Sequence, residues 1–383
     1  MAAGVAAVAS LVVISGTAVA APGGPAKGTP LVFGAVGTNS GPVGIPQAVQ
    51  AFQAYIANWN AHGGYKGHPI KVIYKDGGID PTATAAAARS LVTDDNVIAM
   101  AFNSSFIDCT VNNSFYITTQ IAVLNSGDTP SCYNPSVDFP TLKQGGSGGQ
   151  TILIKYAISK GAKTIAIVAP DVPGVSTVIS AVQAYAKTTS AKVIVPPELS
   201  IAPTAADLDG LLVSLKAQHV DTVIVLGAVS TGELLLTEAA RESFGVDNGI
   251  RYMFVYSEYA PSLATPFNGA YVIIGSYPWT SSNPAVKQAL KLAKRAKVSV
   301  LDGAALGAYQ SAGEFQEVLD SVKGPVTRAS FLRAARHATS IPVPLTPGFK
   351  INLADPKKDL EGGFVVQAKG GTFVLAGPFL TTK

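Results

Sequence analysis

The stretch that decides the fold runs from residue 31 to residue 81, LVFGAVGTNSGPVGIPQAVQAFQAYIANWNAHGGYKGHPIKVIYKDGGIDP. Two apolar, β-branched runs, Leu31–Val36 and Ile70–Lys75, predict strands on either side of one helix. Pro46 suits the first turn of that helix. Apolar residues then recur at helical spacing, at Val49, Phe52, Ile56 and Trp59. A strand, an amphipathic helix and a second strand form a βαβ unit, so this stretch predicts a parallel sheet.

Further strands and helices are predicted on both sides of a glycine cluster at residues 145–149. Ahead of the cluster, the pattern predicts strands at Val97–Ala101 and Ile121–Leu124 and an alanine-rich helix over Thr82–Thr93, capped by Asp80. Behind it, strands are predicted at 164–169, 192–195, 222–226, 252–256 and 271–275, and helices at 175–187, 205–218, 232–244, 284–297, 304–322 and 328–338. The end of the chain, 349–353, 364–368 and 372–375, predicts an antiparallel meander. Two α/β lobes are therefore expected.

The composition fits a folded chain of about two domains and excludes several classes of protein. The chain has 383 residues, of which 48% are hydrophobic and 14% are charged. Intrinsic disorder is excluded, because disordered chains are poor in apolar residues and rich in charge. The formal net charge of +4 falls short of the basic surface that binding to a phosphate backbone requires. No nucleic-acid partner is expected.

The N-terminus has the character of an export signal. Residues 1–26 contain no Asp, Glu, Lys or Arg, and Ala18-Val19-Ala20 fits the small-x-small rule for cleavage. We predict a signal peptide over residues 1–20; the alternative is an uncleaved membrane anchor. The mature protein is then exported, to the periplasm or the cell envelope.

The cysteine pair fits such a destination. In an exported chain, Cys109 and Cys132 favour a disulfide over two free thiols. Closing the loop between them would stabilise the fold by roughly 3 kcal/mol in the chain-entropy model. Two Cys and four scattered His give no ligand spacing for a metal, so no metal site is expected.

Sequence motifs give little support to an enzyme. Residues 145–149, GGSGG, match the nucleophile elbow G-x-S-x-G by letter, but that elbow must follow a buried strand directly. A flexible crossing between lobes is the preferred interpretation, and a hydrolase using Ser147 is the disfavoured one. Nucleotide, dinucleotide and zinc-enzyme motifs are missing from the sequence, so we expect no cofactor and no catalytic residue.

One helix carries an unusual run of basic residues. Lys287, Lys291, Lys294, Arg295 and Lys297 lie on a predicted helix whose other face is apolar. We interpret the basic side as a solvated face, the alternative being a site for an anionic partner.

Several motifs together resemble a known family. They are NSGPV at 39–43, NAHGGYKG at 60–67 and Asp80-Pro81, followed by AFNSS at 101–105 and LNSG at 124–127. They resemble the branched-chain amino-acid-binding family of type I periplasmic solute-binding proteins, which serve ABC importers. The resemblance implies two Rossmann-like lobes with parallel central sheets, joined by three crossovers. Lobe 1 would comprise residues 30–143 and 281–344, and lobe 2 residues 144–280 and 345–383.

The resemblance also implies a ligand between the lobes, where the physics of open parallel sheets would place it. Ser104, Ser105, Asn125 and Ser126 lie at predicted strand ends in lobe 1, where their donors suit a carboxylate or another acceptor. The alternative is that they cap the helices that follow. The same strand ends would bring Cys109 and Cys132 together at the rim of lobe 1.

Lobe 2 would supply the opposite wall of the site. Glu258 stands where the family often places an acidic residue against the ligand ammonium; the alternative is an exposed loop carboxylate. Tyr256, Tyr277 and Trp279 rank lower, as walls for an apolar ligand part or as ordinary core and hinge packing. The sequence departs from the family at residues 44–46 and 171–174, so leucine-like specificity is not carried over.

The function expected from these features is that of an exported, monomeric, non-enzymatic solute-binding protein. It would close like a hinge on a small polar or amino-acid-like molecule and hand it to the permease subunits of an ABC transporter. The alternative is a secreted ligand sensor that presents its closed form to a receptor. A serine hydrolase ranks third.

Overall fold

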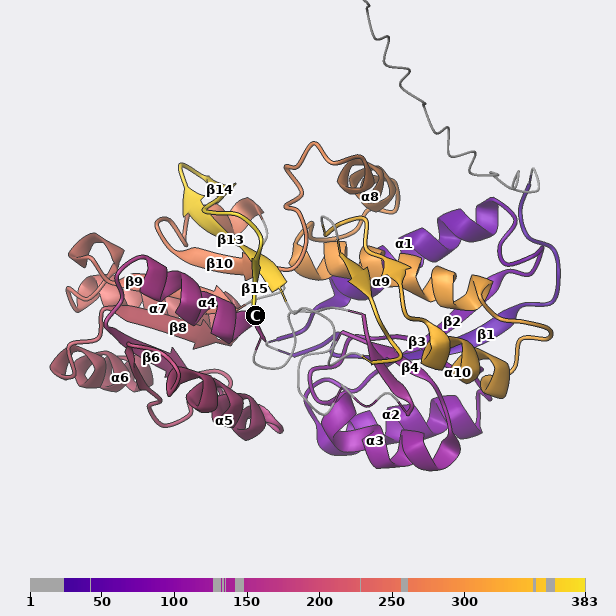
Figure 1. The fold of residues 1–383 in the computed structure, drawn as a ribbon, viewed down its shortest axis with the longest axis horizontal. Helices are drawn as coiled ribbons and strands as arrows, with labels where there is room; N and C mark the ends of the chain where they lie inside the picture. The colour runs from indigo at the N-terminus through magenta and orange to yellow at the C-terminus, as the bar shows by residue number, and fades with distance from the viewer. Residues whose placement is uncertain are drawn as a thin grey trace, which may run out of the picture.

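The computed structural model describes residues 24–41, 43–126, 132, 134, 136–141, 148–227, 229–255, 261–346, 349–355 and 362–382. Two sheets flanked by helices form two lobes that lie side by side (Figure 1). Among these residues, no helix combines the length and the apolar character that crossing a membrane demands. The predicted signal peptide, residues 1–20, lies outside the described residues.

The first sheet has five parallel strands in the order β2-β1-β3-β4-β5. The strands are β1 (Leu31–Gly37), β2 (Ile70–Asp76), β3 (Met100–Asn103), β4 (Val123–Asn125) and β5 (Asp138–Pro140). Its helices are α1 (Pro46–Ala61), α2 (Pro81–Thr93), α3 (Asp108–Thr119), α8 (Pro284–Arg295), α9 (Gly303–Asp320) and α10 (Arg328–His337). Helices α2 and α3 pack together on one side of the sheet, and α1 packs on α9 on the other (Figure 1).

The predicted apolar stripe of α1 forms the centre of this first core. Phe52 is fully buried and stacks on Phe102 of β3, with ring centroids 4.9 Å apart. Phe315 of α9 packs edge-on against Phe33 of β1 at 4.8 Å. Segments from both ends of the chain therefore share one core, because α9 returns to cover the sheet that the N-terminal half builds.

The second sheet follows the order β14-β13-β10-β9-β8-β6-β7, with β15 paired to β13. Its strands are β6 (Thr164–Val168), β7 (Lys192–Ile194), β8 (Thr222–Leu226), β9 (Arg251–Val255), β10 (Tyr271–Ile274), β13 (Gly362–Lys369), β14 (Thr372–Leu375) and β15 (Leu380–Thr381). Helices α4 (Gly148–Ser159), α5 (Val175–Ala186), α6 (Ala205–Ala217) and α7 (Val229–Arg241) flank it. The strands from β6 to β10 are parallel, and β13 and β14 add an antiparallel edge.

The predicted terminal meander is correct for two of its three strands. The third, expected at 349–353, forms the short strand β12 (Lys350–Ile351), which pairs with β11 (Ile341–Pro342) away from the large sheet. Ile351 and Leu353 are buried in the core of the first lobe. Ile351 and Leu353 therefore belong to the first lobe, whereas Phe349 packs on Phe379 just before β15 (centroids 4.4 Å apart).

Three segments connect the lobes, as expected for this fold: β5 to α4, β10 to α8, and β12 to β13. The second and third lie against each other, because the Tyr277 N–H donates to the Leu345 carbonyl (2.9 Å) and the Thr346 hydroxyl donates to the Gly275 carbonyl (2.8 Å). Leu345 belongs to the core of the first lobe. These contacts favour a third crossing that begins later than residue 345.

Candidate ligand site at the switch point of the first sheet

The strand order fixes where a ligand can approach the first sheet. From β1 the chain goes first to β2 on one side and then to β3 on the other. Ligands of open parallel sheets bind at such a switch point, in the crevice outside the carboxyl ends of the strands. An isolated parallel bridge between Gly37 and Ser104 marks this point. The residues that follow β1 and β3 therefore define the candidate site.

Two buried polar atoms face this point without a hydrogen-bond partner. They are the hydroxyl of Ser104, a residue that is 1% exposed, and Oδ1 of Asn39. A Cβ at Gly37 would lie 3.1 Å from Ser104 Oγ and 2.9 Å from Asn39 Oδ1. Gly37 thus lies next to both atoms, and a side chain at this position would crowd them. An unpaired buried polar atom costs roughly 1–3 kcal/mol, so such a pair calls for a functional explanation.

Hydrogen bonds hold the loop that carries Asn39 in place. The Asp76 carboxylate accepts from the backbone N–H of Asn39 (2.9 Å) and of Gly78 (2.9 Å). Burial alone would raise the pKa of Asp76, but these bonds and those from Ser40 lower it below its ordinary value. The Thr38 hydroxyl donates to the Gly78 carbonyl (2.8 Å). The rim of the site is therefore pre-organised around an ionised Asp76.

The four polar residues predicted in lobe 1 differ in what their side chains do. Ser104 has the unpartnered hydroxyl described above, whereas Ser105 Oγ accepts from the Ile107 N–H (3.4 Å) and so resembles a local cap. Asn125 turns its amide inward, where it donates to Asp138 and to the Cys132 carbonyl (3.4 Å). Ser126 is half-buried at the end of β4, and its backbone N–H donates to the Asn103 carbonyl (2.9 Å). The strand ends thus bring all four near one edge, and Ser104 best fits a ligand contact.

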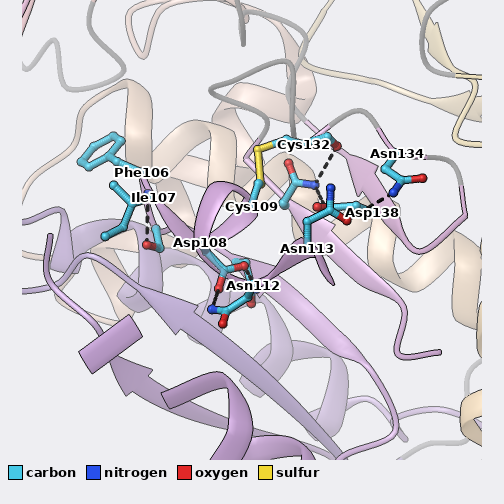
Figure 2. The surroundings of a disulfide bond; sticks show 12 residues. Phe106, Ile107, Asp108, Cys109, Asn112, Asn113, Cys132, Asn134 and Asp138 are labelled. Carbon is cyan, nitrogen blue, oxygen red and sulfur yellow. Dashed lines mark hydrogen bonds between the residues drawn. A yellow bond between two sulfur atoms is a disulfide. The ribbon is translucent and has the colours of Figure 1, made fainter. Parts of the chain in front are cut away.

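The structure contains the predicted disulfide. Cys109, at the start of α3, is bonded to Cys132, with 5.1 Å between their Cα atoms (Figure 2). The bond ties the helix that follows β3 to the segment between β4 and β5. It therefore fixes the same strand ends that form the candidate site.

Two buried carboxyl groups lie beneath this disulfide (Figure 2). Burial raises the pKa of Asp108, although hydrogen bonds from Asn112, Tyr116 and Asn103 oppose the shift. Burial also raises the pKa of Asp138 well above its ordinary value, the charge of Asp108 adds to this effect, and the Asn125 amide partly offsets it. Both carboxyl groups accept hydrogen bonds from amides at strand ends, Asp108 from Asn103 in β3 and Asp138 from Asn125 in β4.

The aromatic residues predicted for lobe 2 have other partners or lie outside the described residues. Tyr277 stacks on Phe364 (centroids 5.2 Å apart) and contacts the cores of both lobes, which places it in the hinge. Trp279 is buried in the first core, and its indole N–H donates to the Asp302 carbonyl (2.6 Å). Tyr256 and Glu258 lie outside the described residues, as does Ser147. Their predicted roles stay predictions.

Asn39 is not among the ligand contacts predicted from the sequence. The signal was present, since Asn39 follows the first predicted strand in the way that Ser104 follows the third. The sequence does not show that the side chains of Asn39 and Ser104 both lie beside Gly37.

The chain matches the model of the family described as "Periplasmic binding protein" over residues 30–371, and it belongs to that family. The matched range spans both lobes and all three crossings, so the family assignment covers the fold as a whole. No curated protein matches the chain in a sequence search.

Solved structures confirm the fold of type I binding proteins of ABC transporters. A fatty acid ABC transporter substrate-binding protein from Thermomonospora curvata superposes with a TM-score of 0.79 at 17% identity, covering 94% of this chain and 95% of that one. An ABC transporter substrate-binding protein from Aeropyrum pernix gives 0.80 at 16%, covering 92% and 96%. A branched chain amino acid ABC transporter protein from Thermus thermophilus with bound valine gives 0.75 at 15%, covering 92% and 97%. The predicted two Rossmann-like lobes are thereby confirmed.

Proposed function

We propose that this protein captures a small solute between its lobes and delivers it to the permease of an ABC transporter. One observation carries the proposal: the unpartnered Ser104 hydroxyl and Asn39 Oδ1 meet at the switch point of the first sheet. Family membership supports the same function. Export to the periplasm or cell envelope, a monomeric state and the absence of catalysis belong to this proposal.

The chemistry of the two side chains narrows the solute. The Ser104 hydroxyl can donate to a carboxylate or carbonyl oxygen, and the Asn39 amide oxygen can accept from a hydroxyl or an amine. A small acid that also carries a donor, such as an amino acid or a hydroxy acid, satisfies both atoms at once. Solutes named for the similar structures, a fatty acid and valine, are likewise carboxylic acids.

Closure would add contacts from the second lobe. A ligand shifts a hinge equilibrium only by binding one state more tightly, so both lobes must contribute to the closed site. Glu258, as a partner for a ligand ammonium, and Tyr256, as an apolar wall, are the sequence-based candidates for that contribution. Tyr277 would serve in the hinge, where it touches both cores.

The test is a thermal-shift panel on the mature chain from Ala21, freed of co-purified solute by mild unfolding and refolding. The panel contains amino acids, hydroxy acids, fatty acids, aromatic acids and amides, because a solute that binds only the folded state raises the melting temperature. Ser104→Ala should abolish the shift without lowering the melting temperature of the free protein, since its hydroxyl has no partner to lose.

The test includes a matched control substitution and a second substitution in the proposed site. Ser180→Ala removes an exposed hydroxyl on α5 in the other lobe and should leave the shift unchanged. Asn39→Ala should weaken binding as Ser104→Ala does. A full shift in both Ser104→Ala and Asn39→Ala would refute the proposed site.

A further inference from the structure

A second pocket lies on the outer surface of the first lobe, away from the switch point. It has a volume of about 270 Å³ and lies between α1 and α8, which pack side by side (Figure 1). Its lining residues are Asn58, His62, Gln288, Lys291, Leu292 and Arg295. The four residues from α8 are spaced as one face of a helix, so the pocket follows the last turns of both helices.

The two charged residues that line this pocket, Lys291 and Arg295, are both basic. Helix α8 and the residues after it carry exposed cations at Lys287, Lys291, Lys294, Arg295 and Lys297. None of their side chains has an ion pair or hydrogen bond within the described part of the chain. Helix α1 contains no charged residue. By contrast, Arg241 in the second lobe pairs with Asp209, Glu238 and Glu242. The positive charge on α8 is therefore not neutralised by the fold.

The pocket offers donors, and none of its lining residues is a carboxylate. Lys291 and Arg295 supply charged donors, and the amides of Asn58 and Gln288 supply neutral ones. His62 Nδ1 donates to the Asn58 carbonyl (2.7 Å), because a carbonyl oxygen can only accept. Nε2 of the neutral imidazole is then an acceptor, so His62 is not counted among the donors. Buried Leu292 supplies an apolar contact. Two cationic side chains suit the double negative charge of a phosphate better than the single charge of a carboxylate.

We propose that this pocket binds a phosphate-type oxyanion, with Arg295 and Lys291 as its principal contacts. Arginine pairs with two oxygens of one phosphate at once, and lysine adds a point charge. The phosphate group can come from a free anion or from a lipid headgroup at the membrane surface. This pocket is separate from the solute site, so the result of a phosphate-binding test does not bear on the proposed transport function. The proposal develops the alternative interpretation of the basic face of α8, that of a site for an anionic partner.

The test compares two variants that remove equal charge. Lys291→Gln/Arg295→Gln changes the pocket, whereas Lys187→Gln/Lys192→Gln changes two exposed cations of the second lobe. Binding of inorganic phosphate and pyrophosphate is measured by calorimetry at fixed ionic strength. Binding to vesicles is measured by co-sedimentation, with phosphatidylglycerol in phosphatidylcholine against pure phosphatidylcholine.

The pocket variant should bind at least tenfold more weakly to whichever of these probes the unaltered protein binds. The control variant should bind that probe within twofold of the unaltered protein. Binding of pyrophosphate in this pattern identifies a free anion as the ligand. The same pattern with anionic vesicles alone identifies a lipid headgroup. Equal weakening in both variants shows that net charge alone is at work, and it overturns the proposal. So does a lack of binding to every probe.

Discussion

Asp302 is the residue whose substitution tests the electrostatics of the first lobe most directly. It is 1% exposed and caps α9, accepting from the Ala305 N–H (2.9 Å) and from the Gln47 amide (2.7 Å). Burial raises its pKa to about 6, and these hydrogen bonds only partly oppose the rise. Asp302→Asn keeps a good capping residue and removes the titrating group.

The magnitude follows from the size of the shift. The pKa rises from 3.8 to about 6, and each unit corresponds to about 1.4 kcal/mol, so the effect is about 3 kcal/mol. A carboxyl group with a raised pKa in the folded state stabilises the fold when protonated. That contribution is present below pH 4 and is lost as the pH rises towards 6. Relative to the unaltered protein, Asp302→Asn should therefore gain about 3 kcal/mol between pH 4 and pH 7.

Tryptophan fluorescence provides the assay. Both tryptophans of the chain, Trp59 and Trp279, lie in the core of the first lobe, so urea unfolding followed by their emission reports on that lobe. The free energy of unfolding is measured at several pH values for both proteins. Asp80→Asn, which makes the same substitution at the exposed cap of α2, is the matched control. The reasoning would be refuted if the free energies of unfolding of Asp302→Asn and of the unaltered protein differed by the same amount at every pH from 4 to 7.

Three further predictions concern the site and its support. Gly37→Ala places a methyl group 2.9 Å from Asn39 Oδ1 and 3.1 Å from Ser104 Oγ, so calorimetry should show the solute binding at least tenfold more weakly; equal affinity would contradict the site. Cys109→Ala/Cys132→Ala should lower the free energy of unfolding by about 3 kcal/mol in urea titrations, and a loss below about 1 kcal/mol would contradict a stabilising role. Glu258→Ala should weaken an ammonium-bearing solute by about 2 to 4 kcal/mol; unchanged affinity removes Glu258 from the site.

The sequence predicts those elements whose burial is apolar and periodic. The stripe of α1 was predictable because Val49, Phe52, Ile56 and Trp59 repeat at helical spacing, and all of them are buried. Helix α3, DCTVNNSFYITT, was not predicted, because part of its buried face is polar. Asp108, Asn112 and Tyr116 are buried there through hydrogen bonds to one another. Such burial depends on partners in three dimensions, so hydropathy alone does not reveal it.

Prediction of the candidate site from the sequence has the same limit. Position at a strand end was enough to select Ser104, Ser105, Asn125 and Ser126, since the carboxyl ends of parallel strands meet at one edge. It was not enough to rank them, because the NH2 group of Asn125 donates to Asp138 and the Cys132 carbonyl while its Oδ1 has no partner. Whether a polar group is satisfied inside the protein depends on contacts between distant segments. Those contacts separate a structural amide from one that is available to a ligand.

Residues at two of the lobe crossings form hydrogen bonds to one turn of α9. The Thr141 hydroxyl, at the start of the first crossing, shares a hydrogen bond with Ser311 of α9 (2.7 Å). Thr346, beside the second crossing, bonds to Gln310 of the same helical turn (3.4 Å). Thr141 also donates to the Asn125 carbonyl through its N–H and its hydroxyl (2.8 Å each). Because the turn that bonds to the crossings is joined to the end of β4, we expect a solute that moves this strand end to act on the hinge.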